Sequence, residues 1–169
     1  MAKRILIYTN HFSPEQFKIN EIVNWITTKD YEVRVVTGIP NYPLGKYYKG
    51  YGFHSISKVE YNGKVIVNRL PLIPRGNGSY IMLILNYLSY FLSALFFTVY
   101  LLFKKKYDYI FVHHTSPFLI AIHPIIYSVF KRKTKKYLWD LDIWPETLEA
   151  MNLIKSRSIL FFISKLVQF

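Results

Sequence analysis

The chain has 169 residues, enough for one domain of ordinary size with its own hydrophobic core. Hydrophobic residues make up 51% of the sequence and aromatic residues 18%, which excludes a disordered or collagen-like protein. The 22 Lys and Arg residues outnumber the 10 Asp and Glu residues, so the net charge of +12 suits a polyanionic partner, and the absence of cysteine excludes disulfides and thiolate metal sites.

The start of the chain predicts a strand, a helix and a second strand. Residues 4–9 (RILIYT) form a short apolar run, and residues 33–37 (VRVVT) form another. Between them, residues 19–27 carry apolar side chains at helical spacing, namely Ile19, Ile22, Val23 and Ile26. This order predicts a βαβ unit, which requires a parallel sheet.

The middle of the chain predicts a hairpin, and the rest returns to alternating helices and strands. A long loop rich in Gly, Pro and Tyr (residues 38–52) precedes two strand-like runs around Asn62-Gly63, the dipeptide best suited to a tight hairpin turn. Helices are then expected over residues 80–103 and 117–130, and strands over residues 109–112 and 136–139. We therefore expect an α/β fold with a mostly parallel sheet, helices on both of its faces and a β-hairpin insertion.

Residues 80–103 are uncharged and long enough to span a bilayer. A polar stripe argues against a lone span, because side chains seven residues apart share one face of a helix: Ser79, Asn86, Ser93 and Tyr100. A span would also separate the first two strands from the last, so that one sheet could not form. We expect a helix that packs on the sheet or lies in the membrane interface, with a true span as the alternative.

Basic residues follow both apolar helices. Lysines occupy positions 104–106, and a second cluster follows the second helix: Lys131, Arg132, Lys133, Lys135 and Lys136. Basic clusters beside apolar helices suit the headgroups of an anionic membrane surface, and solvated surface lysines are the alternative. No recognised nucleic-acid motif accompanies the charge, so we expect no nucleic-acid partner.

Four loops follow the expected strands at their carboxyl ends, where parallel sheets bind ligands. They begin at Asn10, Gly38, His113 and Leu141, and they hold many of the titratable side chains: His11, Glu15, His113, His114, Asp142 and Glu146. We expect these groups to line a cleft.

Several of these side chains have an alternative role. Neighbouring residues of a strand point to opposite faces, so His113 and His114 are poorly placed to share a metal ion. Residues 115–117 (TSP) also suit the start of a helix. Asp140 and Asp142 would share one face of an extended segment and repel each other. The residues alone thus predict a binding cleft without naming a reaction.

Four segments, taken in order, resemble the amino-terminal domain of the family 4 glycosyltransferases: HFSPEQFKINEIVNWI, YEVRVVTGIPNYPLGKYYKGY, YDYIFVHHTSPFLIAI and WDLDIWPETLEA. They are most similar to bacterial enzymes of capsule, O-antigen and colanic-acid synthesis, such as the N-acetyl-L-fucosamine transferase. The family implies two Rossmann-like domains in a GT-B fold and a retaining sugar transfer. By this resemblance residues 1–150 are the acceptor-side domain and residues 151–169 a helical extension.

The resemblance also implies roles for residues of the four loops. His114 and Asp142 are expected to act as catalytic residues that contact the reacting sugars. Nine positions are expected to bind substrate: Asn10, Ser13, Glu15, Asn41, Tyr42, Tyr47, Thr115, Ser116 and Glu146. No metal site is expected. Many relatives have a glycine pair where this chain has Gln16-Phe17, and some nearer relatives share the bulkier form, so the resemblance does not define the acceptor or phosphate contact there.

The sequence ends at Phe169, before the donor-binding domain that the family carries. We therefore expect half an enzyme, inactive alone, with a UDP-sugar as the donor of the complete enzyme and no resident cofactor. Its expected location is cytoplasmic, peripheral on the inner face of the plasma membrane. Its expected partners are a polyprenyl-diphosphate-linked sugar acceptor and a separately encoded donor-binding domain. The alternatives are a non-catalytic binding or scaffolding module, an inactive remnant, and a small integral membrane protein.

Overall fold

The structure is a computed structural model and describes residues 2–104, 106–115, 118–142, 161 and 164. One six-stranded sheet has the order β3-β4-β2-β1-β5-β6. Five strands run parallel: β1 (Lys3–Thr9), β2 (Tyr31–Gly38), β4 (Val65–Leu70), β5 (Tyr109–His114) and β6 (Lys135–Asp140). The edge strand β3 (Ile56–Glu60) is antiparallel to β4. The predicted mostly parallel α/β fold with a hairpin insertion is confirmed.

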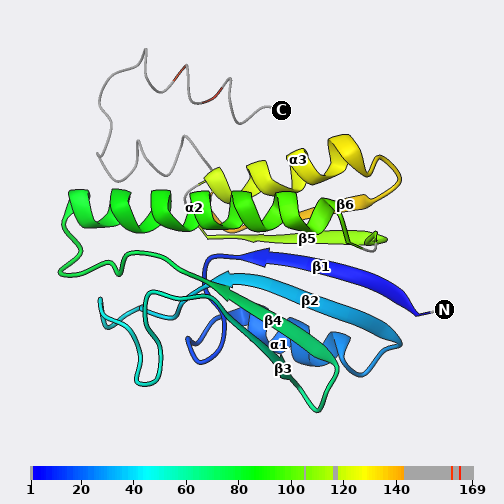
Figure 1. Cartoon of the computed structure of the whole chain (residues 1–169), viewed down its shortest axis with the longest axis horizontal. Coiled ribbons are helices and arrows are strands. Elements are labelled where there is room, and N and C mark those ends of the chain that lie inside the picture. Colours follow the sequence, from blue (N-terminus) through cyan, green and yellow to red (C-terminus); the bar gives the residue numbers. More distant parts are fainter. Residues whose placement is uncertain (1, 105, 116–117, 143–160, 162–163, 165–169) are drawn as a thin grey trace.

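Helices cover both faces of the sheet (Figure 1). α1 (Lys18–Ile26) links β1 to β2 on one face. α2 (Tyr80–Leu102) links β4 to β5 on the other face, and α3 (Ile122–Phe130), preceded by the 3-10 helix η1 (Phe118–Ala121), links β5 to β6 there. From β1 the chain adds β2, β4 and β3 on one side of that strand, and it then returns to add β5 and β6 on the other side. Because crossovers between parallel strands are right-handed, this reversal places α1 opposite α2 and α3.

Alternation along the strands divides the core into two layers. Ile7, Val35 and Val67 point toward α1 and pack with Ile19 and Val23 of that helix. The neighbouring positions point the other way, and their buried apolar side chains form a second cluster with α2 and α3: Leu6, Tyr8, Val36, Ile110, Val112, Tyr90, Ala94, Leu101 and Tyr127. Because both faces of the sheet are buried, its central strands are nearly continuous apolar runs in the sequence.

α2 packs on the sheet through its polar side. Asn86 Nδ2 donates to the carbonyl oxygen of Ile73 (2.6 Å), and Ser93 Oγ donates to that of Pro71 (2.7 Å). Asn86 and Ser93, two members of the polar stripe, therefore satisfy backbone carbonyls of the segment that follows β4, whereas Ser79 and Tyr100 are exposed. The outward side is apolar: Ile81 is 71% exposed and Phe96 is 73% exposed.

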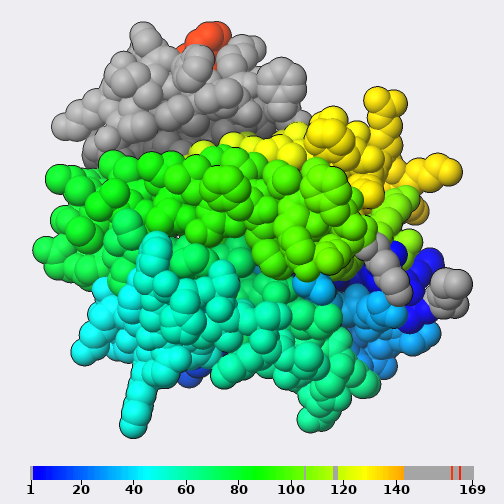
Figure 2. Space-filling view, viewed as in Figure 1, coloured from blue at the N-terminus to red at the C-terminus, as the bar shows by residue number. Residues whose placement is uncertain are grey.

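By length and composition alone, α2 is long and apolar enough to cross a membrane. Figure 2 shows the helix at the molecular surface as a green band along its length. Its inner residues are nevertheless in the core beside the sheet, with Ala94 and Thr98 fully buried.

The structure also settles several expected boundaries. Asn62 and Gly63 both have positive φ (55° and 87°), and Lys64 N donates to the Tyr61 carbonyl (3.2 Å), which is the predicted tight hairpin turn. His113 and His114 are the last residues of β5 and do not begin a loop, because both continue the parallel pairing with neighbouring strands. The expected extension over residues 151–169 lies outside the described residues, apart from Phe161 and Ser164.

Candidate functional site

The candidate site lies at the carboxyl ends of β1 and β5. These strands are neighbours in the sheet, but their connections leave toward opposite faces, and such reversal points form ligand clefts in α/β sheets. The register pairs Thr9 with His113 on one face of the sheet and His114 with Asp140 on the other, so three adjacent strand ends bring polar side chains to the same edge.

His114 and Asp140 form the closest polar pair of this edge. His114 Nδ1 lies 2.5 Å from Asp140 Oδ1, with the imidazole fully buried and the carboxylate 35% exposed. Because a carboxylate accepts hydrogen bonds, Nδ1 carries a proton, and in the neutral imidazole Nε2 then presents its lone pair. Nε2 is buried and has no hydrogen-bond partner among the described residues, and the same holds for the neighbouring Thr115 Oγ1. The carboxylate thus fixes an imidazole whose second nitrogen can accept a hydrogen bond.

His113 points to the opposite face of the sheet, as predicted for adjacent strand residues. Thr9 Oγ1 donates to the His11 carbonyl (2.9 Å), so its oxygen accepts the His113 Nδ1 proton (2.9 Å). Burial, followed by electrostatic interactions with the neighbouring His11 and His114, lowers the pKa of His113 to about 4. His113 is therefore neutral at pH 7, and its Nε2 is buried without a partner in the described part of the chain.

Glu15 joins the loop after β1 to the loop after β2. Its carboxylate is 1% exposed, and Oε2 lies 2.8 Å from His11 Nδ1. Oε1 accepts the backbone N–H groups of Asn41 (2.7 Å) and Tyr42 (2.6 Å). Since these internal donors occupy both oxygens, Glu15 positions Asn41 and Tyr42 at the rim of the site.

Arg75 supplies a cation from the segment after β4. Its backbone N–H donates to Asn41 Oδ1 (3.2 Å), and its guanidinium is hydrogen-bonded to the Tyr87 hydroxyl. The rings of Tyr42 and Tyr87 lie 5.2 and 5.3 Å from the guanidinium carbon. Arg75 Nε is buried and has no partner among the described residues. An arginine held between two aromatic rings suits a planar or phosphorylated ligand.

The predicted site residues fall into two groups and two outliers. The first group surrounds the ends of β1 and β2: Asn10, Glu15, Asn41 and Tyr42. The second surrounds the ends of β5 and β6: His114, Thr115 and Asp142, whose N–H donates to Asp140 Oδ1 (3.2 Å). Ser116 and Glu146 lie outside the described residues.

Ser13 and Tyr47, the two outliers, make structural contacts. The Ser13 carbonyl accepts a hydrogen bond from the buried Arg69 (2.6 Å), and its N–H donates to Asn20 Oδ1 (3.1 Å). The Tyr47 hydroxyl donates to the Leu72 carbonyl (2.8 Å), and its ring packs against the core beneath α2.

Sequence reasoning missed Asp140 and Arg75 as site residues. Asp140 follows Trp139 at a strand end, and only the parallel register shows that it faces His114. Asp140 Oδ1 contacts His114 Nδ1 and also accepts a hydrogen bond from the Asp142 N–H. Arg75 lies in a turn-rich stretch that gave no signal of its own. In the described part of the chain, no three His, Asp or Glu side chains converge as metal ligands.

Fold and site together define a Rossmann-like α/β domain with polar side chains gathered at its carboxyl edge. No protein-family model matches the sequence, and no curated protein matches it. Among solved structures, the sucrose-phosphate synthase from Thermosynechococcus elongatus is similar, with a TM-score of 0.53 and 12% sequence identity. The similarity covers 98% of this chain and 40% of the synthase chain. The chain therefore shares its fold with part of that synthase and spans less than half of the synthase's length.

Proposed function

We propose that this chain is the acceptor-side half of a nucleotide-sugar-dependent glycosyltransferase of cell-surface polysaccharide synthesis, related to the bacterial capsule and O-antigen enzymes. The observation that carries the proposal is the His114–Asp140 pair at the reversal point of a glycosyltransferase-like fold. An imidazole whose Nδ1 proton is held by a carboxylate can accept a proton or a hydrogen bond at Nε2. A sugar hydroxyl is the matching donor.

Each group of the site has a role in this proposal. His114 contacts the reacting sugar, and Asp140 is a positioning residue that fixes the tautomer of His114. Asp142 lies beside the pair and supplies a second polar contact. Tyr42 stacks against a sugar ring, and Arg75 meets the phosphate of the acceptor. Glu15 acts through Asn41 and Tyr42, whose backbone it holds in place.

The acceptor in this proposal is a polyprenyl-diphosphate-linked sugar at the inner face of the plasma membrane. The outward apolar side of α2 supports such a location, with Ile84 62% exposed and Leu88 45% exposed. Basic residues follow the ends of α2 and α3: Lys104, Lys131, Arg132 and Lys133. Apolar side chains beside lysines and arginines are the usual composition of a surface that binds anionic membranes.

The donor side is supplied by a second domain, either further along a longer chain or in a separately encoded one. It would bind the UDP-sugar across the cleft from His114. A non-catalytic membrane-associated binding or scaffolding module remains the alternative, and the outward side of α2 is the feature that favours it.

A transfer assay on washed membranes tests the proposal. The assay supplies a panel of UDP-sugars and a polyprenyl-diphosphate-linked sugar, with this chain alone and together with a donor-binding domain. We expect product only from the combination, and we expect His114→Gln to lower its rate by about 10²–10⁴-fold, the usual contribution of an acid–base group. Asp140→Asn should shift the pH profile as well as lower the rate.

Lys58→Gln, on the exposed edge strand, is the matched control and should leave transfer unchanged. Full activity of the His114→Gln combination would refute the assigned role of His114. Membrane binding without product from any combination would favour the non-catalytic module.

A further inference from the structure

A groove runs along the flank of α2 toward the amino edge of the sheet, away from the candidate site. It consists of three adjoining cavities that share Tyr100, with volumes of about 370, 560 and 360 Å³. Phe97 lines the first two, and Arg34 and Ile66 line the second and third. We call this continuous feature the α2 groove.

The α2 groove exists because α2 covers the centre of the sheet but not its hairpin edge. The helix packs on Tyr8 and Val36 of the central strands. On the same side of β3 and β4, Val59 pairs with Ile66, and Val59 remains 63% exposed. A strip of partly apolar sheet surface is therefore left open beside the helix.

The two ends of the α2 groove differ in chemistry. One end is lined mainly by apolar side chains, among them Leu70, Pro71, Phe96 and Phe97. The other end contains Arg4, Arg34 and Lys104, with Glu32 as the acidic residue among its described lining. Charge and apolar surface thus occupy opposite ends of one elongated feature.

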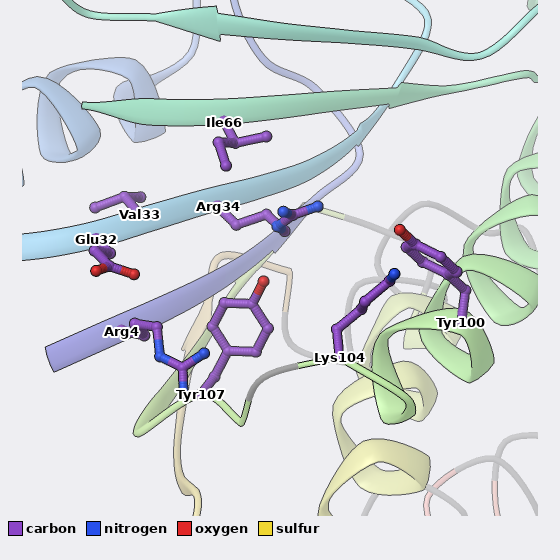
Figure 3. A pocket seen from close by; sticks show the side chains of 8 residues that line it. All are labelled: Arg4, Glu32, Val33, Arg34, Ile66, Tyr100, Lys104 and Tyr107. Atoms are coloured by element: carbon purple, nitrogen blue, oxygen red, sulfur yellow. The ribbon is translucent and has the colours of Figure 1, made fainter. Parts of the chain in front are cut away.

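The polar side chains of the basic end line one cavity. In Figure 3, the Arg34 guanidinium and the Tyr107 hydroxyl turn toward each other, with Arg4 and Lys104 on either side. Arg34 Nη1 donates to Asn68 Oδ1 (3.0 Å), and the Arg4 guanidinium lies 5.7 Å from the centre of the Tyr107 ring. Burial raises the pKa of Tyr107, so its hydroxyl stays protonated and can donate.

These cations are available to an anion. Within the part of the chain that the structure describes, the ion pairs involve other residues, and Arg4, Arg34 and Lys104 form none. Glu32 of β2 is paired with Arg4 of β1, and its carboxylate offsets part of the positive charge of the three basic side chains. Three cations against one carboxylate still favour a phosphate.

We propose that the α2 groove binds an anionic membrane lipid, with an acyl chain along Phe97 and Ile66 and the phosphate between Arg34 and Lys104. Charge complementarity identifies the headgroup end, and the apolar end favours a ligand with a hydrocarbon chain. The groove also opens beside the outward side of α2, since Phe96 and Tyr100 are 73% and 47% exposed. This site shares no residue with the candidate transfer site, so it stands or fails independently of the proposed function.

Vesicle flotation of the full chain tests the headgroup end. Vesicles of phosphatidylcholine alone are compared with vesicles that contain phosphatidylcholine and phosphatidylglycerol in a ratio of about 7 to 3, and we expect binding to the second. The Arg4→Gln, Lys104→Gln double variant should bind about 25-fold more weakly, since each basic residue near an anionic surface contributes about fivefold. The Lys29→Gln, Lys58→Gln control removes the same charge on the α1 side and should change binding by less than about threefold.

Photo-crosslinking tests the acyl chain. Phosphatidylglycerol with a diazirine in one acyl chain should give adducts at Phe97, Tyr100 and Ile66. Val59→Trp fills the groove without changing charge, so it should remove these adducts while vesicle binding persists. Thermal unfolding of each variant confirms that it is folded.

Three results would overturn the proposal. Equal weakening by the double variant and its control would mean diffuse electrostatic attraction. Adducts confined to Ile84 and Leu88 would mean contact through the outer side of α2 alone. Binding of inorganic phosphate that matches binding of the lipid would mean a free anion site.

Discussion

Replacement of Glu15 separates a structural role of its carboxylate from a substrate-binding role. The side chain is 1% exposed and accepts hydrogen bonds from three internal groups: His11, Asn41 and Tyr42. Glu15→Ala removes all of these acceptors. Glu15→Gln keeps one oxygen for the two backbone donors, and its amide can donate to His11 Nδ1 in the other tautomer.

The two substitutions should differ in their cost to the free energy of unfolding. An orphaned buried donor costs about 1–3 kcal/mol. The Asn41 N–H is fully enclosed, whereas the Tyr42 N–H is only partly buried, so Glu15→Ala should cost about 2–4 kcal/mol. Glu15→Gln exchanges charged for neutral hydrogen bonds and should cost about 1–2 kcal/mol.

Urea unfolding followed by circular dichroism measures both costs. Glu21→Ala is the control, because Glu21 forms an exposed ion pair with Lys18 (3.1 Å) and should cost less than about 1 kcal/mol. Equal costs below about 1 kcal/mol for both Glu15 variants would refute the anchoring role. Glu15 would then be free to bind substrate, as the sequence suggested.

Three further predictions follow from burial and backbone geometry. His113 has a pKa of about 4 in the folded protein against 6.5 in the unfolded chain, so the unfolded state binds a proton first as the pH falls. The free energy of unfolding, measured by urea titration, should therefore drop by about 2 kcal/mol between pH 7.5 and 5. His113→Asn should reduce that drop. Gly45→Ala places a Cβ 1.9 Å from a carbonyl oxygen of the loop after β4, so it should lower the melting temperature more than Gly50→Ala, where nothing lies within 4 Å and only positive φ opposes the change. Asn86→Leu should cost about 1–3 kcal/mol in the same unfolding assay because it removes a buried donor, whereas Leu92→Ser on the outer side of α2 should cost less than about 1 kcal/mol.

Local sequence patterns predicted most of the fold because each pattern reflects interactions between residues that are close together in the chain. Apolar runs marked the buried parallel strands, and helical spacing of Ile19, Val23 and Ile26 marked the side of α1 that packs on the sheet. Asn62-Gly63 marked the hairpin because few other residues adopt positive φ at low cost. These features depend on neighbours in the chain, so the sequence shows them directly.

The candidate site was only partly predictable because it depends on strand register. The loop from Asn10 follows β1 as expected, since a parallel sheet gathers its carboxyl ends on one edge, whereas His113 and His114 belong to the strand β5 itself. The partner of His114 could not be chosen, because a shift of one residue in β6 would exchange Asp140 for a neighbour on the other face. Glu15 was expected to bind substrate because it is a carboxylate in a loop at a strand end. Its two backbone donors, however, come from a second loop whose path no local sequence pattern determines.

α2 connects the two proposals in space. Its first half reaches the candidate site, where Asn86 contacts Asn41 (3.3 Å) and Tyr87 contacts Arg75. Its last turn carries Tyr100, which lines the basic end of the α2 groove at the opposite edge of the sheet. If a bilayer covers the outer side of this helix, both edges of the sheet lie at the membrane surface. A lipid held in the groove would then orient the domain so that the sheet edge with His114 faces an acceptor that is itself anchored in the membrane.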